Sequence, residues 1–270
     1  MNGDLAVALF LNLLLGHLLG DFVLQPGRLV IAKRDGAPGL LLHTAIVAAC
    51  TLAVVSGTLA RDWPAALLVT GLHLVVERFT ILTYLKTPTR GLFTLLLDQT
   101  MHALSIALVV WLVGAWHLDG QAVTFGLTIS TRTLASVVGV LTVSLFGSIL
   151  AFETVNSIGA SEDFKGRVLQ MDGARIAGFV ERGAALVAAL TLHPALVVVP
   201  FVPRIAFAIA TRDDERKRLL AEAAAGLALC VAALVAVELV ADVTTGAVDL
   251  SVITLAPGAE AASALSRLLS

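Results

Sequence analysis

Charged residues are scarce in this 270-residue chain: Asp, Glu, Lys and Arg make up 14% of it, whereas hydrophobic residues make up 58%. Soluble domains hold about 25% charged residues, so the shortage excludes an ordinary water-soluble fold. Long apolar segments with few charges are typical of helices that cross a bilayer. The composition therefore predicts an all-α integral membrane protein.

Positive charge and cysteine are also in short supply. The formal net charge is -2, which lacks the basic surplus of nucleic-acid-binding proteins, so we expect no nucleic-acid partner. Cys50 and Cys230 lie in apolar stretches without the spacing of a zinc motif or a disulfide framework. The sequence has no phosphate-binding loop, nucleotide fingerprint, serine-nucleophile elbow or aspartate-rich prenyl-diphosphate motif. The first residues lack the positive charge of a signal peptide, so a retained first span is expected.

Eight apolar segments approach the length of about 20 residues that one crossing needs. They cover residues 4–24, 38–59, 63–84, 91–117, 132–156, 176–192, 195–211 and 217–241. The sixth and seventh meet at Pro194, where proline favours a break, and Pro200 and Pro203 are expected to distort the seventh. The predicted organisation is about eight transmembrane helices, with a four-helix half (1–117) and a second membrane half (118–270) that ends in a tail after residue 241.

Lysine and arginine gather in the loops that follow the odd-numbered spans. These residues are Arg28, Lys33, Arg34, Lys86, Arg90, Lys165, Arg167, Arg212, Arg216, Lys217 and Arg218. Because positively charged short loops stay in the cytoplasm, both termini are expected outside. The expected location is a bacterial inner or plasma membrane, with lipids as partners.

Ionisable residues recur inside the first four predicted spans. Three pairs are spaced four residues apart: His17 with Asp21, His73 with Glu77, and Asp98 with His102. Residues with this spacing share one helical face. With His43, all seven side chains fall in the cytoplasmic leaflet when depth is estimated from about 1.5 Å of rise per residue. Because ionisable groups inside a membrane are costly, such a cluster indicates function.

Imidazole and carboxylate together suit zinc, iron or manganese. The predicted metal ligands are His17, His43, His73, His102, Asp21 and Asp98, and the predicted catalytic carboxylates are Asp21, Glu77 and Asp98. Zinc hydrolysis and dinuclear iron chemistry both stay open at this point. The same residues would also suit a proton or ion pathway, or polar packing between helices.

The first two helical hairpins resemble a diverged tandem repeat. The His17-x3-Asp21 spacing recurs as His73-x3-Glu77, which favours a parallel repeat about an axis along the membrane normal. Gly16 and Gly20 also predict a close contact between helices.

Arginines in the second half fall at the same predicted depth as the histidines. A guanidinium group binds phosphate or carboxylate through two parallel hydrogen bonds. The predicted substrate-binding residues are Arg78, Arg182, Arg204, Glu181 and Glu222. The alternative is internal ion pairing among them.

Four strings resemble the bacterial membrane family catalogued as domain of unknown function 3307. They are His17-Leu-Leu-Gly-Asp21-Phe-Val-Leu-Gln25, Leu41-Leu-His43, Leu97-Asp98-Gln99-x2-His102 and Gly173-Ala-Arg175-Ile-Ala-Gly178-x2-Glu181-Arg182. The resemblance spans most of residues 10 to 240. It implies membership of the family but no established activity, and Glu77 stands where that pattern has aspartate.

From these residues we predict a metal-dependent membrane enzyme, with hydrolysis favoured over oxidation. Its substrate is expected to be amphipathic or lipid-linked and to enter from the cytoplasmic leaflet. A proton- or metal-coupled transporter is the first alternative, and a structural or partner-binding membrane protein is the second.

Overall fold

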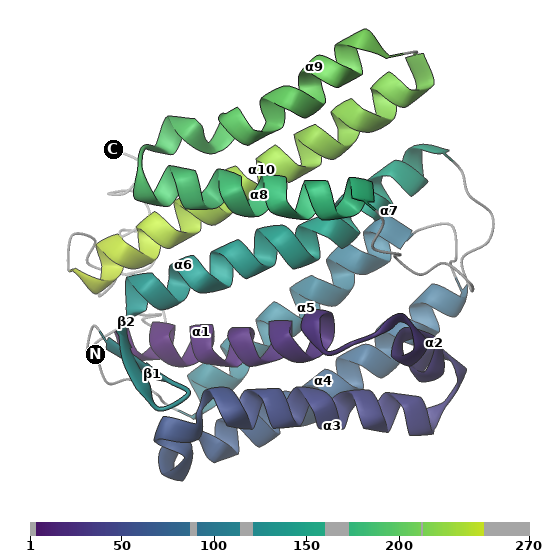
Figure 1. Ribbon diagram of the computed structural model, residues 1–270. Helices are drawn as coiled ribbons and strands as arrows, with labels where there is room; N and C mark the ends of the chain where they lie inside the picture. Colours follow the sequence, from purple (N-terminus) through teal and green to yellow (C-terminus); the bar gives the residue numbers. More distant parts are fainter. Residues whose placement is uncertain (1–3, 87–90, 114–120, 160–172, 212, 246–270) are drawn as a thin grey trace, which may run out of the picture.

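The computed structural model describes residues 4–86, 91–113, 121–159, 173–211 and 213–245 (Figure 1). The first half contains α1 (Asp4–Leu18), the π-helical turn η1 (Leu19–Val23), α2 (Gly27–Asp35), α3 (Ala37–Val54), the 3-10 turn η2 (Ser56–Thr58), α4 (Leu59–Lys86) and α5 (Gly91–Leu112). The second half contains β1 (Gln121–Thr124), β2 (Leu127–Ser130), α6 (Thr131–Leu141), the π-helical turn η3 (Thr142–Phe146), α7 (Gly147–Gly159), α8 (Gly173–Thr191), the 3-10 helix η4 (Pro194–Phe201), α9 (Val202–Ala210) and α10 (Asp213–Thr244).

Several helices have the length and composition of membrane spans. The candidates are Ala37–Val54, Ser56–Tyr84, Gly91–Leu112, Thr131–Val155 and Glu215–Thr244, and a sixth is the bent pair of Val7–Val23 with Gly27–Asp35. The predicted class, a helical membrane protein, is therefore confirmed. The described residues give five or six candidate spans, however, and do not confirm eight. The tandem repeat and the side on which each terminus lies remain predictions.

The difference in span number arises mainly at residues 176–192 and 195–211. Helix α8 forms there, but Arg175, Glu181 and Arg182 all lie within its 19 residues. Residues Pro194–Ala210 form a shorter apolar helical segment. Its first part is a 3-10 helix rather than an α-helix, as the prolines predicted, because proline has no N–H for the α-helical hydrogen bond. The polar face of α8 therefore makes this hairpin a poor candidate for two independent crossings.

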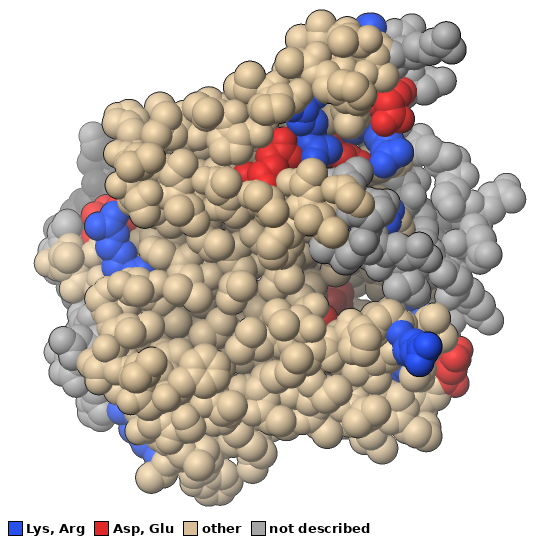
Figure 2. Space-filling view, viewed as in Figure 1, with Lys and Arg blue, Asp and Glu red and all other residues tan. Residues whose placement is uncertain are grey.

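The outer surface fits a lipid environment. Figure 2 shows a broad area without charge; Lys, Arg, Asp and Glu lie at the left and right edges of this face and in one group in its upper middle. Large apolar side chains are exposed on the surface of the bundle, including Leu104 at 64% exposure and Phe207 at 63%. Single exposed apolar residues are normal on soluble proteins, but a continuous uncharged face of this kind is not. We therefore treat the described helices as a membrane-embedded bundle.

The structure has one feature at each end of α1 that the sequence does not predict. At its N-terminal end, the antiparallel hairpin of β1 and β2 is tied to α1 by Asn12, which donates to the Val123 carbonyl at 3.0 Å and accepts from the Thr124 hydroxyl at 2.7 Å. At its other end, η1 leads into α2 after a bend of 95°. Figure 1 shows α2 beside the start of α3, at the end of the bundle opposite the hairpin. The bend returns polar residues of α2 towards the bundle interior.

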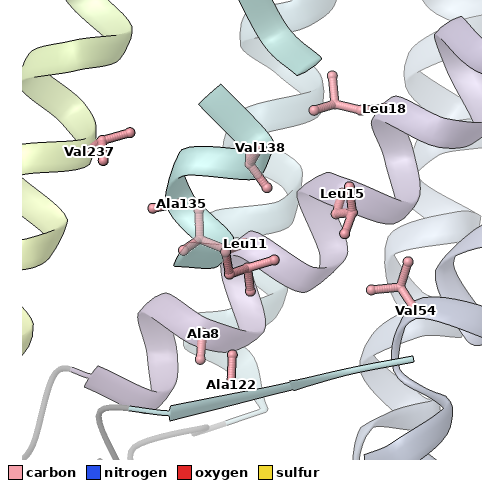
Figure 3. Packing of buried hydrophobic residues seen from close by; sticks show 10 residues of the cluster. Ala8, Leu11, Leu15, Leu18, Val54, Ala122, Ala135, Val138 and Val237 are labelled. Atoms are coloured by element: carbon pink, nitrogen blue, oxygen red, sulfur yellow. The ribbon is translucent and has the colours of Figure 1, made fainter. Parts of the chain in front are cut away.

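Helix α1 is the central packing element. Figure 3 shows Leu11, Leu15 and Leu18 of α1 meeting Val138 of α6 and Val54 of α3. Leu11 is 6% exposed and Val54 is fully buried. Burial of one such side chain stabilises a fold by about 1.5–3 kcal/mol in water, and in lipid the close packing itself supplies the attraction. This packing holds α1 against α3 and α6, while Leu9 and Leu13 on another face of α1 pack against α4 and α5.

Two glycines allow α1 and η1 to lie directly against α3. A Cβ atom at Gly16 would lie 2.6 Å from the Cα of Thr51, and one at Gly20 would lie 2.7 Å from the Cα of Val47. Both distances are shorter than real carbon contacts, and both partners are backbone atoms that cannot move away alone. The predicted close contact is therefore confirmed, and it brings the polar end of α1 against α3.

Replacing Gly20 with Ala is expected to lower the midpoint of thermal unfolding in detergent. The added methyl group would force α1 and α3 apart, and overpacking of this kind costs about 1–3 kcal/mol. Gly71→Ala is the matched control, because a Cβ atom at Gly71 meets nothing within 4 Å and alanine favours the helix by about 1 kcal/mol. Equal midpoints for the two variants would contradict the close-contact argument.

Candidate metal centre

The ionisable residues predicted for the first half lie together in the structure. They come from α1 and η1 (His17, Asp21), α3 (His43), α4 (His73, Glu77) and α5 (Asp98, His102). All four histidines are buried, with at most 2% of each residue exposed. Asp21 and Glu77 are also buried, whereas Asp98 is partly exposed. The predicted convergence of these helices on one polar cluster is confirmed.

The imidazole rings form one continuous group. His43 and His73 approach through their Nε2 atoms at 3.0 Å. The ring centroids of His73 and His102 are 4.5 Å apart, and those of His17 and His102 are also 4.5 Å apart. Histidines on four different segments therefore share a single buried space.

The carboxylates face these rings without hydrogen-bonding to the histidine of their own helix. The i,i+4 pairs are separated by 3.7 Å in His17–Asp21, 3.9 Å in His73–Glu77 and 3.6 Å in Asp98–His102. Such nitrogen–oxygen distances are too long for a normal hydrogen bond. Across helices the contacts are shorter, since His43 Nε2 lies 3.1 Å from Asp21 Oδ1 and 3.5 Å from Glu77 Oε2.

Gln25 holds the ring of His43. In the amide orientation that satisfies its neighbours, its oxygen accepts from His43 Nδ1 at 3.1 Å and from Lys33 Nζ at 2.8 Å. With Nδ1 donating to Gln25, neutral His43 presents the lone pair of Nε2 to the cluster. Gln25 belongs to the motif that begins at His17 but was assigned no role from the sequence. Its position four residues after Asp21 is the signal that would have identified it.

Lys33 is a further member that the sequence predictions missed. Its ammonium lies 2.8 Å from Glu77 Oε1 and 3.9 Å from Asp21 Oδ1, and its side chain is 10% exposed. It therefore compensates two buried carboxylates while Glu77 Oε2 stays turned towards His43. From the sequence, Lys33 is predicted only as a loop charge. Pro26-Gly27 indicates a turn at the break, but the local sequence does not show that the 95° bend returns α2 to the cluster.

Several polar atoms of the cluster have no hydrogen-bond partner among the described residues. They are His17 Nε2, His73 Nδ1, Asp98 Oδ1 and His102 Nε2. A buried polar atom without a partner costs about 1–3 kcal/mol. A cation placed among these lone pairs would compensate that cost. Three sets offer donor atoms within 4.8 Å of one another: Asp21, His43, His73 and Glu77; His17, His73 and His102; and Asp21, Asp98 and His102.

A cavity of about 380 Å³ adjoins the cluster. Asp21, Glu77 and Asp98 line it together with Gln25 and Lys33, so the carboxylates stand between the cavity and the histidines. The remaining wall includes the apolar side chains of Phe22, Ile81, Leu95, Leu145, Ile149, Phe152 and Phe179. The cavity therefore offers a polar wall beside an apolar one.

A second cavity, of about 180 Å³, lies between helices of the second half. Arg182, Arg204 and Glu222 line it, and Ser148 and Phe152 line both cavities. Glu181, which is also predicted to bind substrate, pairs with Arg204 and so lies beside the second cavity. Arg78 is exposed and lines neither cavity, because residue i+1 on a helix faces away from the side that Glu77 turns inwards.

Arg182, which is buried, and Arg204, which is partly exposed, differ in their partners. Arg204 pairs with Glu181 at 2.7 Å and with Glu222 at 2.6 Å, so the alternative of internal ion pairing holds for it. Arg182 donates from Nε to the Val143 carbonyl at 2.9 Å and from one terminal nitrogen to the Ser148 hydroxyl at 2.6 Å. Val143 lies in the π-helical turn η3. Arg182 therefore binds a carbonyl in a turn where the regular α-helical hydrogen bonding is interrupted.

Residues 9–126 match the family model described as a protein of unknown function, DUF3307. The predicted resemblance to this family is thereby confirmed over those residues, which include all seven members of the His/carboxylate cluster. The string from Gly173 to Arg182 lies outside the matched region. No curated protein and no solved structure matches the chain.

Replacing Lys33 with Met is expected to destabilise the metal-free protein by about 3 kcal/mol, because removal of one partner leaves buried carboxylates uncompensated. Lys217→Met is the control, since Lys217 is an exposed lysine on α10. Thermal unfolding after chelator treatment measures both variants. A similar, small change in both would show that Lys33 does not compensate the cluster.

Proposed function

We propose that this chain is a metal-dependent membrane enzyme, of the hydrolase class, that acts on an amphipathic or lipid-linked substrate at the cytoplasmic leaflet. The observation that carries the proposal is the donor set of Asp21, His43, His73 and Glu77, four buried residues whose ligand atoms lie within 4.8 Å of one another. Zinc, iron and manganese all accept this mixture of imidazole and carboxylate.

The spacing of these donors is compatible with a single ion. Two ligands that each lie about 2.0–2.2 Å from an ion, at octahedral to tetrahedral angles, are about 2.8–3.6 Å apart. In this set, His43 Nε2 lies 3.0 Å from His73 Nε2, 3.1 Å from Asp21 Oδ1 and 3.5 Å from Glu77 Oε2. Lys33 compensates part of the negative charge of the two carboxylates, and an ion among the four donors would compensate the rest and bind the imidazole lone pairs.

The surrounding residues support ligation by His43. A histidine that binds a metal through one nitrogen usually donates the other N–H to a carbonyl or carboxylate, which fixes the ring and raises its basicity. Gln25 supplies that acceptor for His43 Nδ1. Lys33 holds Glu77 by one oxygen and leaves the other for the set. Gln25 and Lys33 are thus positioning residues in the proposal.

A divalent metal at this site would polarise the reacting bond and lower the pKa of water. The carboxylates then have two tasks: to complete the ligand set and to accept a proton within reach of the cavity. Asp21, Glu77 and Asp98 all line the cavity wall, which supports their predicted catalytic role. Iron would permit oxidation instead, and the donor set does not discriminate between the two reactions.

The two cavities together suit a substrate with an anionic group and an apolar body. Arg182 and Arg204 each direct a terminal nitrogen to within 3.1 Å of the position that a Cβ atom of Gly178 would occupy. Two guanidinium groups at one point favour a phosphate or carboxylate oxygen there. Ser148 and Phe152 separate this point from the first cavity. We therefore assign the anionic group to the arginines and the reacting bond to the cavity beside the carboxylates.

An apolar layer favours an enzyme over the alternative transporter. One turn from His17, His73 and His102, on the side away from the first cavity, lie Leu13, Val69 and Ile106, each at most 2% exposed. They belong to a single packed cluster of α1, α4 and α5. A transport route needs polar groups or water across the whole bilayer. The buried apolar layer interrupts such a route below the histidines.

The predicted orientation places the site near the cytoplasmic surface of a bacterial inner or plasma membrane. Lys33 and Arg34 follow the first span and line the first cavity, and the positive-inside rule favours the cytoplasmic side for this end of the bundle. A lipid substrate would then reach the site from the cytoplasmic leaflet, with membrane lipids as the surrounding partners.

Replacing His73 with Ala is expected to remove most of the bound metal from protein purified with zinc, iron or manganese. His193→Asn is the matched control: His193 caps η4 by accepting from the Ala195 N–H at 3.2 Å, and asparagine keeps an acceptor at the cap. Elemental analysis of folded protein measures both. Wild-type protein that binds none of the three metals under these conditions would overturn the proposed function.

Replacing Gly178 with Ala is expected to weaken binding of short-chain phosphatidic acid about tenfold, the effect of losing one charge-assisted hydrogen bond of about 1.5 kcal/mol. The methyl group would lie between the two guanidinium groups. Gly173→Ala is the control, because a Cβ atom there meets nothing within 4 Å. Unchanged affinity in both variants, with metal content retained, would remove the second cavity from substrate recognition.

A further inference from the structure

The cluster holds more donors than one ion can use. Four histidines and three carboxylates make seven ligand residues, whereas zinc takes four ligands in most sites and an octahedral ion takes six. Some of the donors lie outside the four-residue set. They are the unpartnered nitrogens of His17 and His102 and the unpartnered oxygen of Asp98. These three residues need an explanation of their own.

Asp21 connects the two groups of donors. Its Oδ1 lies 3.1 Å from His43 Nε2, in the set that also contains His73 and Glu77. Its Oδ2 faces the other way, 3.7 Å from His17 Nε2. A carboxylate whose two oxygens face two separate groups of nitrogen ligands has the geometry of a bridging ligand.

The second group of donors shares Asp21 and His73 with the first. Asp98 Oδ1 lies 3.6 Å from His102 Nε2, and both atoms lack a hydrogen-bond partner among the described residues. Asp21, Asp98 and His102 offer donor atoms within 4.8 Å of one another, and so do His17, His73 and His102. Gln99 donates to Asp98 Oδ2 at 2.8 Å, which leaves Oδ1 for the group. His73 belongs to both groups and therefore lies between them.

We propose that the cluster is a dinuclear metal centre in which Asp21 bridges two ions. His43, His73 and Glu77 would hold the first ion, and Asp98 and His102 would hold the second, with His17 beside His102 as a further nitrogen donor. The inference rests on the proposed metal-dependent function and deepens it. Ions bridged in this way lie about 3.5–4 Å apart in two-metal enzymes, where the pair stabilises both the attacking and the leaving oxygen of a displacement. The arrangement suits a substrate whose reacting group is anionic, such as a phosphate ester.

The lining of the first cavity agrees with this assignment. Asp21, Glu77 and Asp98 are the ligands that reach the cavity, so one carboxylate of each ion and the bridge are presented to a substrate. The histidines lie behind these carboxylates, between the carboxylates and the apolar layer. A substrate entering the cavity would thus face both ions at once.

The test measures how many ions the full-length protein binds and whether their electron spins are coupled. Wild-type protein in detergent is stripped with chelator, reloaded with Mn²⁺ alone and freed of excess metal. We expect two Mn²⁺ per chain by elemental analysis, and the electron paramagnetic resonance spectrum of a spin-coupled pair. His43→Ala and His102→Ala are each expected to keep one ion with the spectrum of isolated Mn²⁺. His193→Asn is expected to keep the coupled pair.

The outcomes separate this inference from the function on which it rests. One Mn²⁺ per folded wild-type chain, or two without spin coupling, would overturn the dinuclear centre and leave a mononuclear enzyme. Absence of binding by Mn²⁺, zinc and iron would overturn both. The wild-type measurement decides these points even if a variant fails to fold. Loss of both ions in His43→Ala and in His102→Ala, with folding retained, would refute the division into two ligand groups.

Discussion

The burial of Asp21 is the constraint on which the site depends. A carboxylate inside an apolar bundle is tolerated only when other groups compensate its charge. Asp21 lies near His17 on α1, His43 on α3 and Lys33 on α2. The Asp21 side chain thereby lies near residues of three segments, and the close contact of Gly20 with α3 keeps these residues within reach of its carboxylate. Any shift of α1 along α3 would separate Asp21 from these partners.

The two π-helical turns place polar groups in both halves of the bundle. η1 contains Asp21 and precedes the bend into α2, whereas η3 contains Val143, whose carbonyl accepts from Arg182. A π-helical turn interrupts the regular hydrogen bonding of a helix and often occurs at functional sites. In this protein each turn brings a charged side chain to a buried position. Ser148 and Phe152 then connect the two polar regions through the shared cavity wall.

The division between polar and apolar layers explains how so many ionisable groups can be buried in a membrane bundle. The histidines occupy one level of α1, α3, α4 and α5, and the packed layer of Leu13, Val69 and Ile106 lies directly beneath it. In the polar level the charged and polar groups compensate one another, whereas the apolar level is stabilised by the packing of its side chains. Chemistry confined to one side of such a layer is consistent with an enzyme that draws its substrate from a single leaflet.

The sequence by itself determined the membrane class and the seven residues of the cluster, because low charge, the i,i+4 spacing of six of these residues and the position of His43 near the start of its span are local properties of the chain. Only the tertiary structure decided the roles of Lys33 and Gln25, the partners of Arg182 and the number of helices that could span a bilayer. These depend on a 95° bend and on contacts between residues far apart in the sequence. Helical periodicity specifies which side chains share a face. The distance between faces on different helices is set by packing across the whole bundle.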